Sequence, residues 1–283
     1  MKKLFIISLC VLFFSCIEES KNSSKPQEVS ADITLEEHVI VSDFQKIIDT
    51  TGVKGSILLY DVKKNTYYSN AFSLANTGKL PASTYKIPNS IIALETNVVK
   101  DENEMFIWNG EERFLKSWET DLTFKQAFQR SCVPCYQEVA RKIGVARMNL
   151  FLEKLQYGTI VVNYSNLDTF WLQGTSKITQ FQQINFLKRL QENKLPISTE
   201  TSEIVKDMMV IKETENYVLR GKTGWSITNN INNGWFVGYL EKGDQVLFFA
   251  TNVEAASDYN QKDFQKNRKE LTYKALAILN ILN

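Results

Sequence analysis

Strand-forming segments lie near both ends of this sequence, and a long helix-forming stretch separates them. Between about residues 88 and 207, apolar residues recur at three- and four-residue spacing, which is typical of amphipathic helices. Strand-like runs bounded by turn residues occur at 55–60, 67–68, 217–220, 234–240 and 246–252, and 263–282 has the pattern of a closing helix. Because strands from the two ends must pair to bury their apolar faces, we predict an α/β fold of the α+β type, with an antiparallel sheet flanked by helices and an all-helical domain inserted in the middle.

The first 37 residues are expected to lie outside the folded domain. Lys2 and Lys3 precede an apolar run that ends at Ser15, shorter than the roughly 20 residues that span a bilayer but suited to a signal peptide. Few large apolar residues follow up to about Thr34, which is typical of a tether. The expected organisation is a signal peptide (1–15), a flexible tether (16–37), an α/β domain (38–80 and 208–283) and a helical domain (81–207), with 38–283 as a single catalytic unit.

Export leaves two alternatives at Cys16. Ser15-Cys16 resembles the cleavage site of bacterial lipoproteins, where the cysteine is lipidated and becomes the new N-terminus, although Phe13 stands where leucine is usual. The alternative is an ordinary cleaved signal followed by soluble release. We expect an exported, periplasmic protein, either anchored to the membrane through a lipid on Cys16 or free.

Charge and histidine content exclude several classes of function. The 33 basic and 32 acidic side chains leave a formal charge of +1, so no net field attracts nucleic acid or an anionic membrane. His38 is the only histidine, which rules out a His-rich zinc hydrolase and leaves a Ser-His-Asp triad only if it uses this residue. Because His38 borders the tether, we expect it to be exposed or locally packed and to have no part in chemistry. The base of an enzyme would then be a lysine or a carboxylate.

Ser83 and Lys86 are the first candidates for such chemistry. They lie three residues apart, just before Pro88, a residue suited to the first turn of a helix. Residues i and i+3 share a face of an α or 3₁₀ turn, so the hydroxyl and the amine can lie side by side. A lysine can accept the serine proton only if burial or neighbouring cations lower its pKa. Taken alone, the pair is also compatible with a polar helix entry and an exposed lysine.

Two further motifs follow Ser83 and Lys86 along the chain. The only Ser-x-Val is Ser131-Cys132-Val133, and the only Lys-Thr-Gly is Lys222-Thr223-Gly224. This order resembles the penicillin-recognising serine enzymes, whose β-lactamase/transpeptidase-like fold would then be expected here. The surrounding segments narrow the resemblance to the class D, oxacillinase-type β-lactamases: 83–90, 131–134 with 136–137, 170–174, 221–225 and 234–238. One departure is Tyr157-Gly158-Thr159, where the family usually has Tyr-Gly-Asn.

The resemblance implies roles for four catalytic residues. Ser83 would attack the β-lactam carbonyl and form an acyl-enzyme. Lys86 would react with CO₂, supplied as bicarbonate, to give an N-carboxylated side chain that acts as the general base, with no metal or organic cofactor. Trp171 would donate its indole N–H to that carbamate, and Ser131 would relay a proton to the lactam nitrogen; a helix cap is the alternative role of Ser131.

The resemblance also implies a set of substrate-binding residues. Lys222, Thr223 and Arg268 would bind the substrate carboxylate, and the backbone N–H groups of Ser83 and Trp225 would form the oxyanion hole. Arg268 could instead be a surface arginine, because lysines flank it. The full expected substrate-binding set is Val133, Lys222, Thr223, Gly224, Trp225, Arg268, Leu115 and Ile227, the last two at the mouth of the cleft.

Three functional hypotheses remain open at this point. The first is a hydrolase that opens penicillin-type antibiotics and confers resistance to them. The second is a β-lactam sensor or penicillin-binding protein that is acylated without efficient turnover. The third is a redox protein that uses Cys132 and Cys135, although a helical pattern precedes this pair where a thioredoxin-like site would follow a strand. The same two cysteines could form a disulfide or simply pack at a helix start. The oligomeric state is left open.

Overall fold

A computed structural model of the protein describes residues 36–282, which belong to one compact unit. The predicted signal peptide, Cys16 and all but the end of the predicted tether lie outside the described residues. Strand β1 begins at Glu37, the last residue of that expected tether. Within the described part of the chain, no helix combines the length and hydrophobicity needed to cross a membrane.

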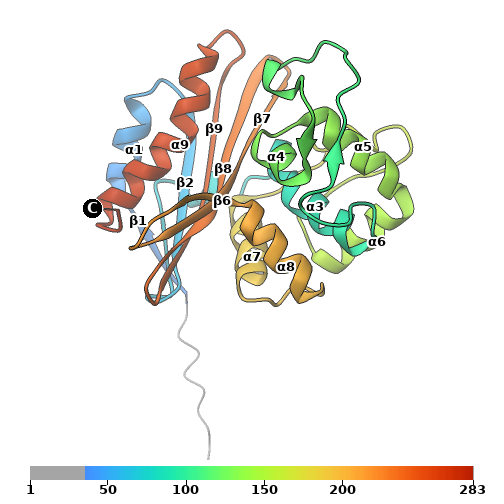
Figure 1. The fold of residues 1–283 in the computed structure, drawn as a ribbon. Coiled ribbons are helices and arrows are strands. Elements are labelled where there is room, and N and C mark those ends of the chain that lie inside the picture. Colours follow the sequence, from blue (N-terminus) through green and yellow to red (C-terminus); the bar gives the residue numbers. More distant parts are fainter. Residues whose placement is uncertain (1–35, 283) are drawn as a thin grey trace, which may run out of the picture. The chain divides into compact units, whose positions relative to one another are not determined.

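A seven-stranded sheet forms one layer of this unit (Figure 1). Its strand order is β1-β3-β2-β9-β8-β7-β6, and all neighbouring pairs are antiparallel except β1 with β3. Strand β2 pairs with β9 from Lys54 opposite Glu254 to Asp61 opposite Leu247, so the two ends of the chain meet in the middle of the sheet. The strands are β1 Glu37–Ile40, β2 Lys54–Asp61, β3 Thr66–Ser69, β6 Val210–Glu213, β7 Val218–Thr228, β8 Ile231–Lys242 and β9 Gln245–Ala256. The predicted antiparallel sheet is confirmed.

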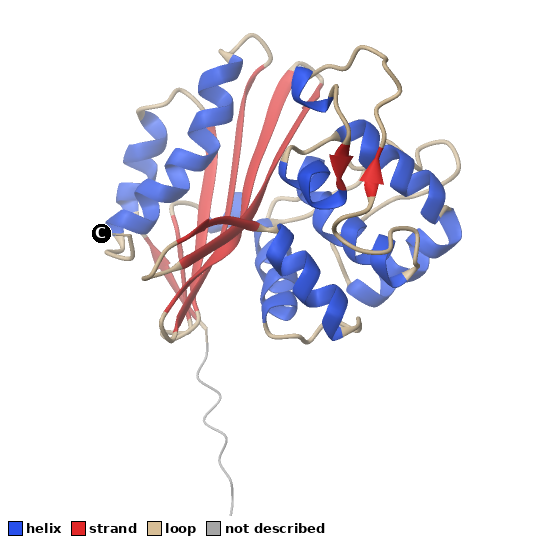
Figure 2. Cartoon of the chain, viewed as in Figure 1, coloured by secondary structure: helices blue, strands red, loops and turns tan. Residues whose placement is uncertain are grey.

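Helices cover both faces of the sheet (Figure 2). Successive strand residues point to opposite faces, so Leu59 packs with Phe44 of α1 (Ser42–Asp49) and Phe264 of α9 (Gln261–Ile278), whereas Leu58 packs in the core on the other face. That second core contains the remaining helices. They are α2 Phe72–Ala75, α3 Lys86–Glu95, α4 Phe124–Gln129, α5 Val133–Ile143, α6 Val145–Leu155, α7 Gln180–Gln191 and α8 Thr199–Met208, with short 3₁₀ helices η1 Ala82–Tyr85 and η2 Lys116–Trp118.

The middle of the chain is mainly but not entirely helical. Two short strands, β4 Met105–Phe106 and β5 Leu122–Thr123, pair with each other inside it. A strand of two residues has no detectable alternation of apolar and polar side chains, so the expectation of an all-helical insertion was wrong here.

The edge strands β1 and β6 were also missed by the sequence patterns. Both expose most of their residues and lack the half-buried alternation on which strand prediction depends. His38 lies on β1, where its exposed ring stacks on Phe72 with ring centroids 4.7 Å apart. The expectation that this histidine is exposed or locally packed is therefore confirmed.

Candidate active site

Ser83 and Lys86 meet where helix η1 passes into helix α3. The Nζ atom of Lys86 donates a hydrogen bond to Oγ of Ser83 across 3.1 Å. Only 1% of the Lys86 surface is exposed, and this burial lowers the pKa of its amine from 10.5 to about 7. The i, i+3 spacing thus produces the predicted contact, and the fold leaves much of the amine neutral near pH 7.

The turn that carries Ser83 is held against strands β7 and β8. Trp235 of β8 donates its indole N–H to the carbonyl oxygen of Leu80 across 2.8 Å. Gly224 of β7 faces the same turn, and a Cβ atom at this position would lie 3.0 Å from the carbonyl oxygen of Pro81. Ala82, directly before Ser83, has a φ of 49°, a conformation that L-residues adopt only at a cost in free energy. Gly224 therefore permits the close approach that fixes the position of Ser83.

Ser131 lies in the connection between α4 and α5. Its φ is 56°, and its Oγ accepts a 2.9 Å hydrogen bond from Nζ of Lys222 on β7. Burial, assisted by the positive charges of Lys86 and Arg268, holds the pKa of Lys222 well below its usual value. The alternative role of Ser131 as a helix cap is wrong, because Cys132 is the N-cap of α5 and its Sγ accepts the backbone N–H of Cys135 at 3.3 Å.

Trp171 is buried beside the residue that precedes Lys86. Its ring stacks on Tyr85, with centroids 5.9 Å apart and the planes 15° from parallel. The indole N–H of Trp171 is fully buried and has no hydrogen-bond partner within residues 36–282. A buried donor without an acceptor costs free energy. Because no described side chain accepts from this N–H, an additional acceptor group next to Trp171 would be stabilised by it.

A cleft of about 300 Å³ opens over Ser83 and Ser131. Lys86 and Lys222 do not line it, because both are buried behind the two serines. Its wall contains no Asp or Glu side chain, so its fixed charges are positive. The lining residues are Ser83, Phe114, Leu115, Trp118, Gln129, Arg130, Ser131, Val133, Thr223, Trp225, Gln265 and Arg268.

Arg268 of α9 supplies one of those positive charges. The side chain is largely buried, and its Nη1 donates to the carbonyl oxygen of Gly224. Burial lowers the pKa of the guanidinium to about 10, so Arg268 remains charged at neutral pH. The neighbouring Lys266 is exposed and does not line the cleft. Of Arg268 and Lys266, only Arg268 lines the cleft. The alternative that Arg268 is an ordinary surface arginine is therefore wrong.

The two residues expected at the cleft mouth differ in position. Leu115 lines the cleft, but Ile227 does not, and 48% of its surface is exposed. Ile227 shares a face of β7 with Thr223 and Trp225, yet it lies two residues beyond Trp225, roughly 6.6 Å along the strand. Of the two residues that the resemblance places at the mouth, Leu115 lines the cleft.

Several lining residues were not predicted from the sequence. Phe114 is 77% exposed at the rim, and the indole of Trp118 donates to the carbonyl oxygen of Arg130 at 2.9 Å. Arg130 and Gln129 could have been found from their position next to Ser131. Phe114 and Trp118 belong to the segment between β4 and β5, and no local pattern indicates that this segment reaches the cleft.

The segment 157–159 is connected by hydrogen bonds to helix η1, which carries Ser83. The hydroxyl of Tyr157 donates to Gln183 across 3.3 Å, and Gln183 donates to Thr84 of η1 across 2.9 Å. The exposed Thr159 pairs with Lys177 through backbone hydrogen bonds in both directions at 2.8 Å. The side chain of Thr159 is not needed for this connection, because the backbone makes it.

The geometry defines a serine enzyme in which lysine, not histidine, lies next to the nucleophile. In the described part of the chain, no cluster of three His, Cys, Asp or Glu residues could hold a metal ion. Residues 54–277 match the penicillin binding protein transpeptidase domain family.

Individual relatives show which branch of this broad family the chain resembles. Beta-lactamase OXA-48 of Klebsiella pneumoniae is 42% identical over 201 residues, covering 71% of this chain and 76% of the relative. The probable beta-lactamase YbxI of Bacillus subtilis is 34% identical over 225 residues, covering 80% and 84%. The crystal structure of a class D beta-lactamase from Sebaldella termitidis is 38% identical, with a TM-score of 0.83, and the match covers 88% of this chain and 100% of that one. The chain belongs to the class D β-lactamases.

Proposed function

We propose that the protein hydrolyses the β-lactam amide of penicillin-type antibiotics through an acyl-enzyme on Ser83, with N-carboxylated Lys86 as the general base. The observation that carries this proposal is the buried Lys86 amine, whose pKa is near 7 and whose Nζ lies 3.1 Å from the Ser83 hydroxyl. A neutral amine is the form that adds CO₂. Family membership supports β-lactam hydrolysis, and the lysine geometry supports this mechanism.

The residues around Lys86 fit a carboxylated amine. The buried N–H of Trp171 lacks an acceptor among the described residues, and a carbamate oxygen would be one. A carbamate on Lys86 would supply an anionic base that takes a proton from a hydroxyl or from water at neutral pH. Tyr136 lies under the Lys86 amine, with its ring centroid 5.0 Å from Nζ, and helps to exclude water.

Ser131 and Lys222 are suited to deliver a proton to the lactam nitrogen. As the amide bond of the substrate breaks, its nitrogen must gain a proton, and the Ser131 hydroxyl can donate its own while it is replenished from Lys222 at 2.9 Å. The low pKa of Lys222 makes this ammonium a better acid than an ordinary lysine. Backbone N–H groups of Ser83 and Trp225 would bind the developing oxyanion.

The positive cleft wall is suited to a carboxylate-bearing substrate. Arg268 and Thr223 both line it, and a guanidinium binds a carboxylate through charge-assisted hydrogen bonds. Because no acidic residue lines the cleft, nothing there opposes this binding electrostatically.

The direct test follows hydrolysis of a chromogenic cephalosporin with and without added bicarbonate. Steady turnover that bicarbonate increases and that Ser83→Ala abolishes is the expected result. Stoichiometric acylation without turnover would instead favour a β-lactam sensor or penicillin-binding protein. Expression in a susceptible bacterium should raise the penicillin concentration that inhibits growth, and the Ser83→Ala variant should not.

We further propose that the chain is exported to the periplasm, with lipidation at Cys16 as the means of anchoring. The basis is the short apolar run and the Ser15-Cys16 pair of the sequence. Mass measurement of the mature N-terminus tests it: the expected mass includes a diacylglyceryl group on Cys16, and an unmodified residue there would refute the anchor.

A further inference from the structure

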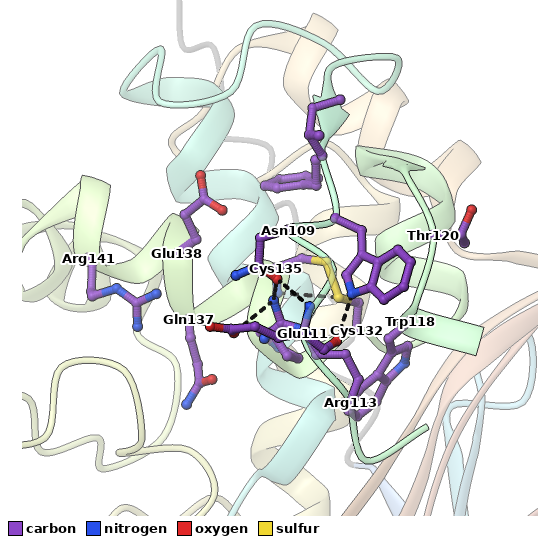
Figure 3. Close-up of a pocket in the computed structure, with 14 residues that line it drawn as sticks. Asn109, Glu111, Arg113, Trp118, Thr120, Cys132, Cys135, Gln137, Glu138 and Arg141 are labelled. Atoms are coloured by element: carbon purple, nitrogen blue, oxygen red, sulfur yellow. Dashed lines mark hydrogen bonds and ion pairs between the residues drawn. A yellow bond between two sulfur atoms is a disulfide. The ribbon is translucent and has the colours of Figure 1, made fainter. Parts of the chain in front are cut away.

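A disulfide joins Cys132 and Cys135 (Figure 3), and Cys132 directly follows Ser131 in the sequence. It links the N-cap residue of α5 to the first turn of that helix. None of the roles proposed above for the active site uses it. Both cysteines line a second cavity of about 290 Å³, which shares Trp118 with the cleft over Ser83.

The disulfide and the backbone fix Ser131 from opposite sides. On the α4 side, the N–H groups of Ser131 and Cys132 donate to the carbonyl oxygens of Phe128 and Ala127 at 3.0 and 2.8 Å. On the α5 side, the covalent link holds Cys132 to Cys135. Ser131 must keep a φ of 56° for its hydroxyl to lie 2.9 Å from Lys222, and a free chain seldom adopts that conformation.

The two sulfur atoms differ in access and in chemistry. Cys132 is 1% exposed, whereas Cys135 is half-buried, and the cavity gives a small thiol a path to the bond. The Sγ of Cys132 accepts the N–H of Cys135 at the N-terminus of the eleven-residue helix α5. That donor and the helix terminus stabilise a thiolate at Cys132, which makes this sulfur the better leaving group.

We propose that the Cys132–Cys135 disulfide is a redox-sensitive positioning element for Ser131, and that a dithiol reductant slows acylation by opening it. The thiolate of the reductant attacks Sγ of Cys135, and the Cys132–Cys135 bond breaks with Cys132 leaving as a thiolate. The second thiol of the reductant then attacks the mixed disulfide, releases Cys135 and closes the reductant into its own disulfide. Two electrons and two protons pass to the protein. The inference rests on the proposed role of Ser131.

Opening this bond should act locally. The disulfide closes a loop of only four residues, so it removes less chain entropy from the unfolded state than a long-range disulfide does. Its two ends lie within one helix turn, and reduction leaves the side chain of Cys132 in the core and that of Cys135 packed against it. The expected consequence is a misplaced Ser131 hydroxyl in a protein that remains folded.

The experiment compares the oxidised protein with the protein reduced by dithiothreitol, using stopped-flow acylation by a chromogenic cephalosporin. Thiol titration verifies a gain of two thiols. A positioned proton donor increases the rate of the step that it assists by about 10²–10⁴-fold. We therefore expect partial displacement of the Ser131 hydroxyl to slow acylation by at least about fivefold. Deacylation, in which the lactam nitrogen no longer takes part, should stay within about twofold, a difference that general loosening of the fold would not produce.

Cys135→Ala separates this effect from other effects of the reductant. The variant should acylate at the rate of the reduced protein, with or without dithiothreitol. A reduced protein with two additional thiols and an unchanged acylation rate would overturn the inference, and so would a variant as fast as the oxidised protein. Absence of turnover in the oxidised protein would instead refute the proposed function itself.

Discussion

The Lys86 amine donates a hydrogen bond to the Ser83 hydroxyl across 3.1 Å while almost its entire side chain is buried. The proximity follows from one turn of helix, but the chemistry follows from burial. Burial lowers the pKa of this lysine to about 7. Much of the amine is therefore neutral near pH 7, and the neutral form is the one that can react with CO₂.

Lys86→Ala should abolish turnover and leave the fold intact. The proposed base contributes about 10²–10⁴-fold to the rate, so hydrolysis should fall by at least that factor. Steady-state hydrolysis and circular dichroism measure the two effects. Lys46→Ala, which removes an exposed lysine on α1, is the matched control and should hydrolyse normally. A Lys86→Ala protein with a near wild-type rate would refute the assigned base.

Recovery of activity after CO₂ is supplied should be faster at pH 8 than at pH 6. Below its pKa of about 7, the Lys86 amine is protonated and cannot add CO₂. The neutral fraction falls from about 0.9 at pH 8 to about 0.1 at pH 6, so the initial rate of recovery should fall about tenfold. The measurement uses protein stripped of CO₂ and an equal concentration of dissolved CO₂ at both pH values. Equal recovery rates would contradict a buried amine with this pKa.

Trp171→Phe should increase the concentration of bicarbonate needed for full activity. Phenylalanine keeps an aromatic ring next to Tyr85 but removes the indole N–H that lacks a partner among the described residues. A hydrogen bond to a charged group is worth about 1.5–3 kcal/mol, which corresponds to about a tenfold to hundredfold weaker retention of the carbamate.

The ¹³C NMR signal of labelled carbamate in Trp171→Phe reports this retention independently of activity. Trp108→Phe is the control, because its indole N–H donates to the carbonyl oxygen of Glu111 outside the cleft. An unchanged carbamate signal in Trp171→Phe would show that the N–H serves another purpose.

Arg268→Ala should raise KM by about tenfold to a hundredfold and change kcat much less, because a hydrogen bond to a charged partner contributes about 1.5–3 kcal/mol to binding. Steady-state kinetics with a penicillin measure the two constants. Lys266→Ala removes an equal charge from the exposed side of α9 and should leave KM within about twofold. If both variants raise KM equally, the effect is one of net charge and Arg268 does not bind the carboxylate directly.

Local patterns predicted the parts of the fold that bury alternating or helical apolar faces. Strands β2, β8 and β9 were indicated as apolar runs, because they are buried on both faces, and the closing helix α9 was indicated by the apolar face that it presents to one core. Strands β1 and β6 were missed because the edges of this sheet expose most of their side chains.

The candidate site also contains residues that the sequence predicted and residues that it did not. Ser83, Ser131 and Thr223 were predicted and all line one cleft, and Gly224 contacts the turn of the nucleophile. Trp118 and Phe114 were missed, since they reach the cleft from the segment between β4 and β5, whose only regular element is the three-residue helix η2. Ile227 was expected at the mouth, but it does not line the cleft and is exposed on β7.

By itself, the sequence determined which reactive groups the chain carries and that Ser83 and Lys86 share one helical turn, because helix geometry makes that contact local. The tertiary structure alone decided that Lys86 is buried and that Lys222, 91 residues beyond Ser131, donates to its hydroxyl. Desolvation and long-range contacts depend on every element packed around a side chain, so no short segment of the sequence could specify them.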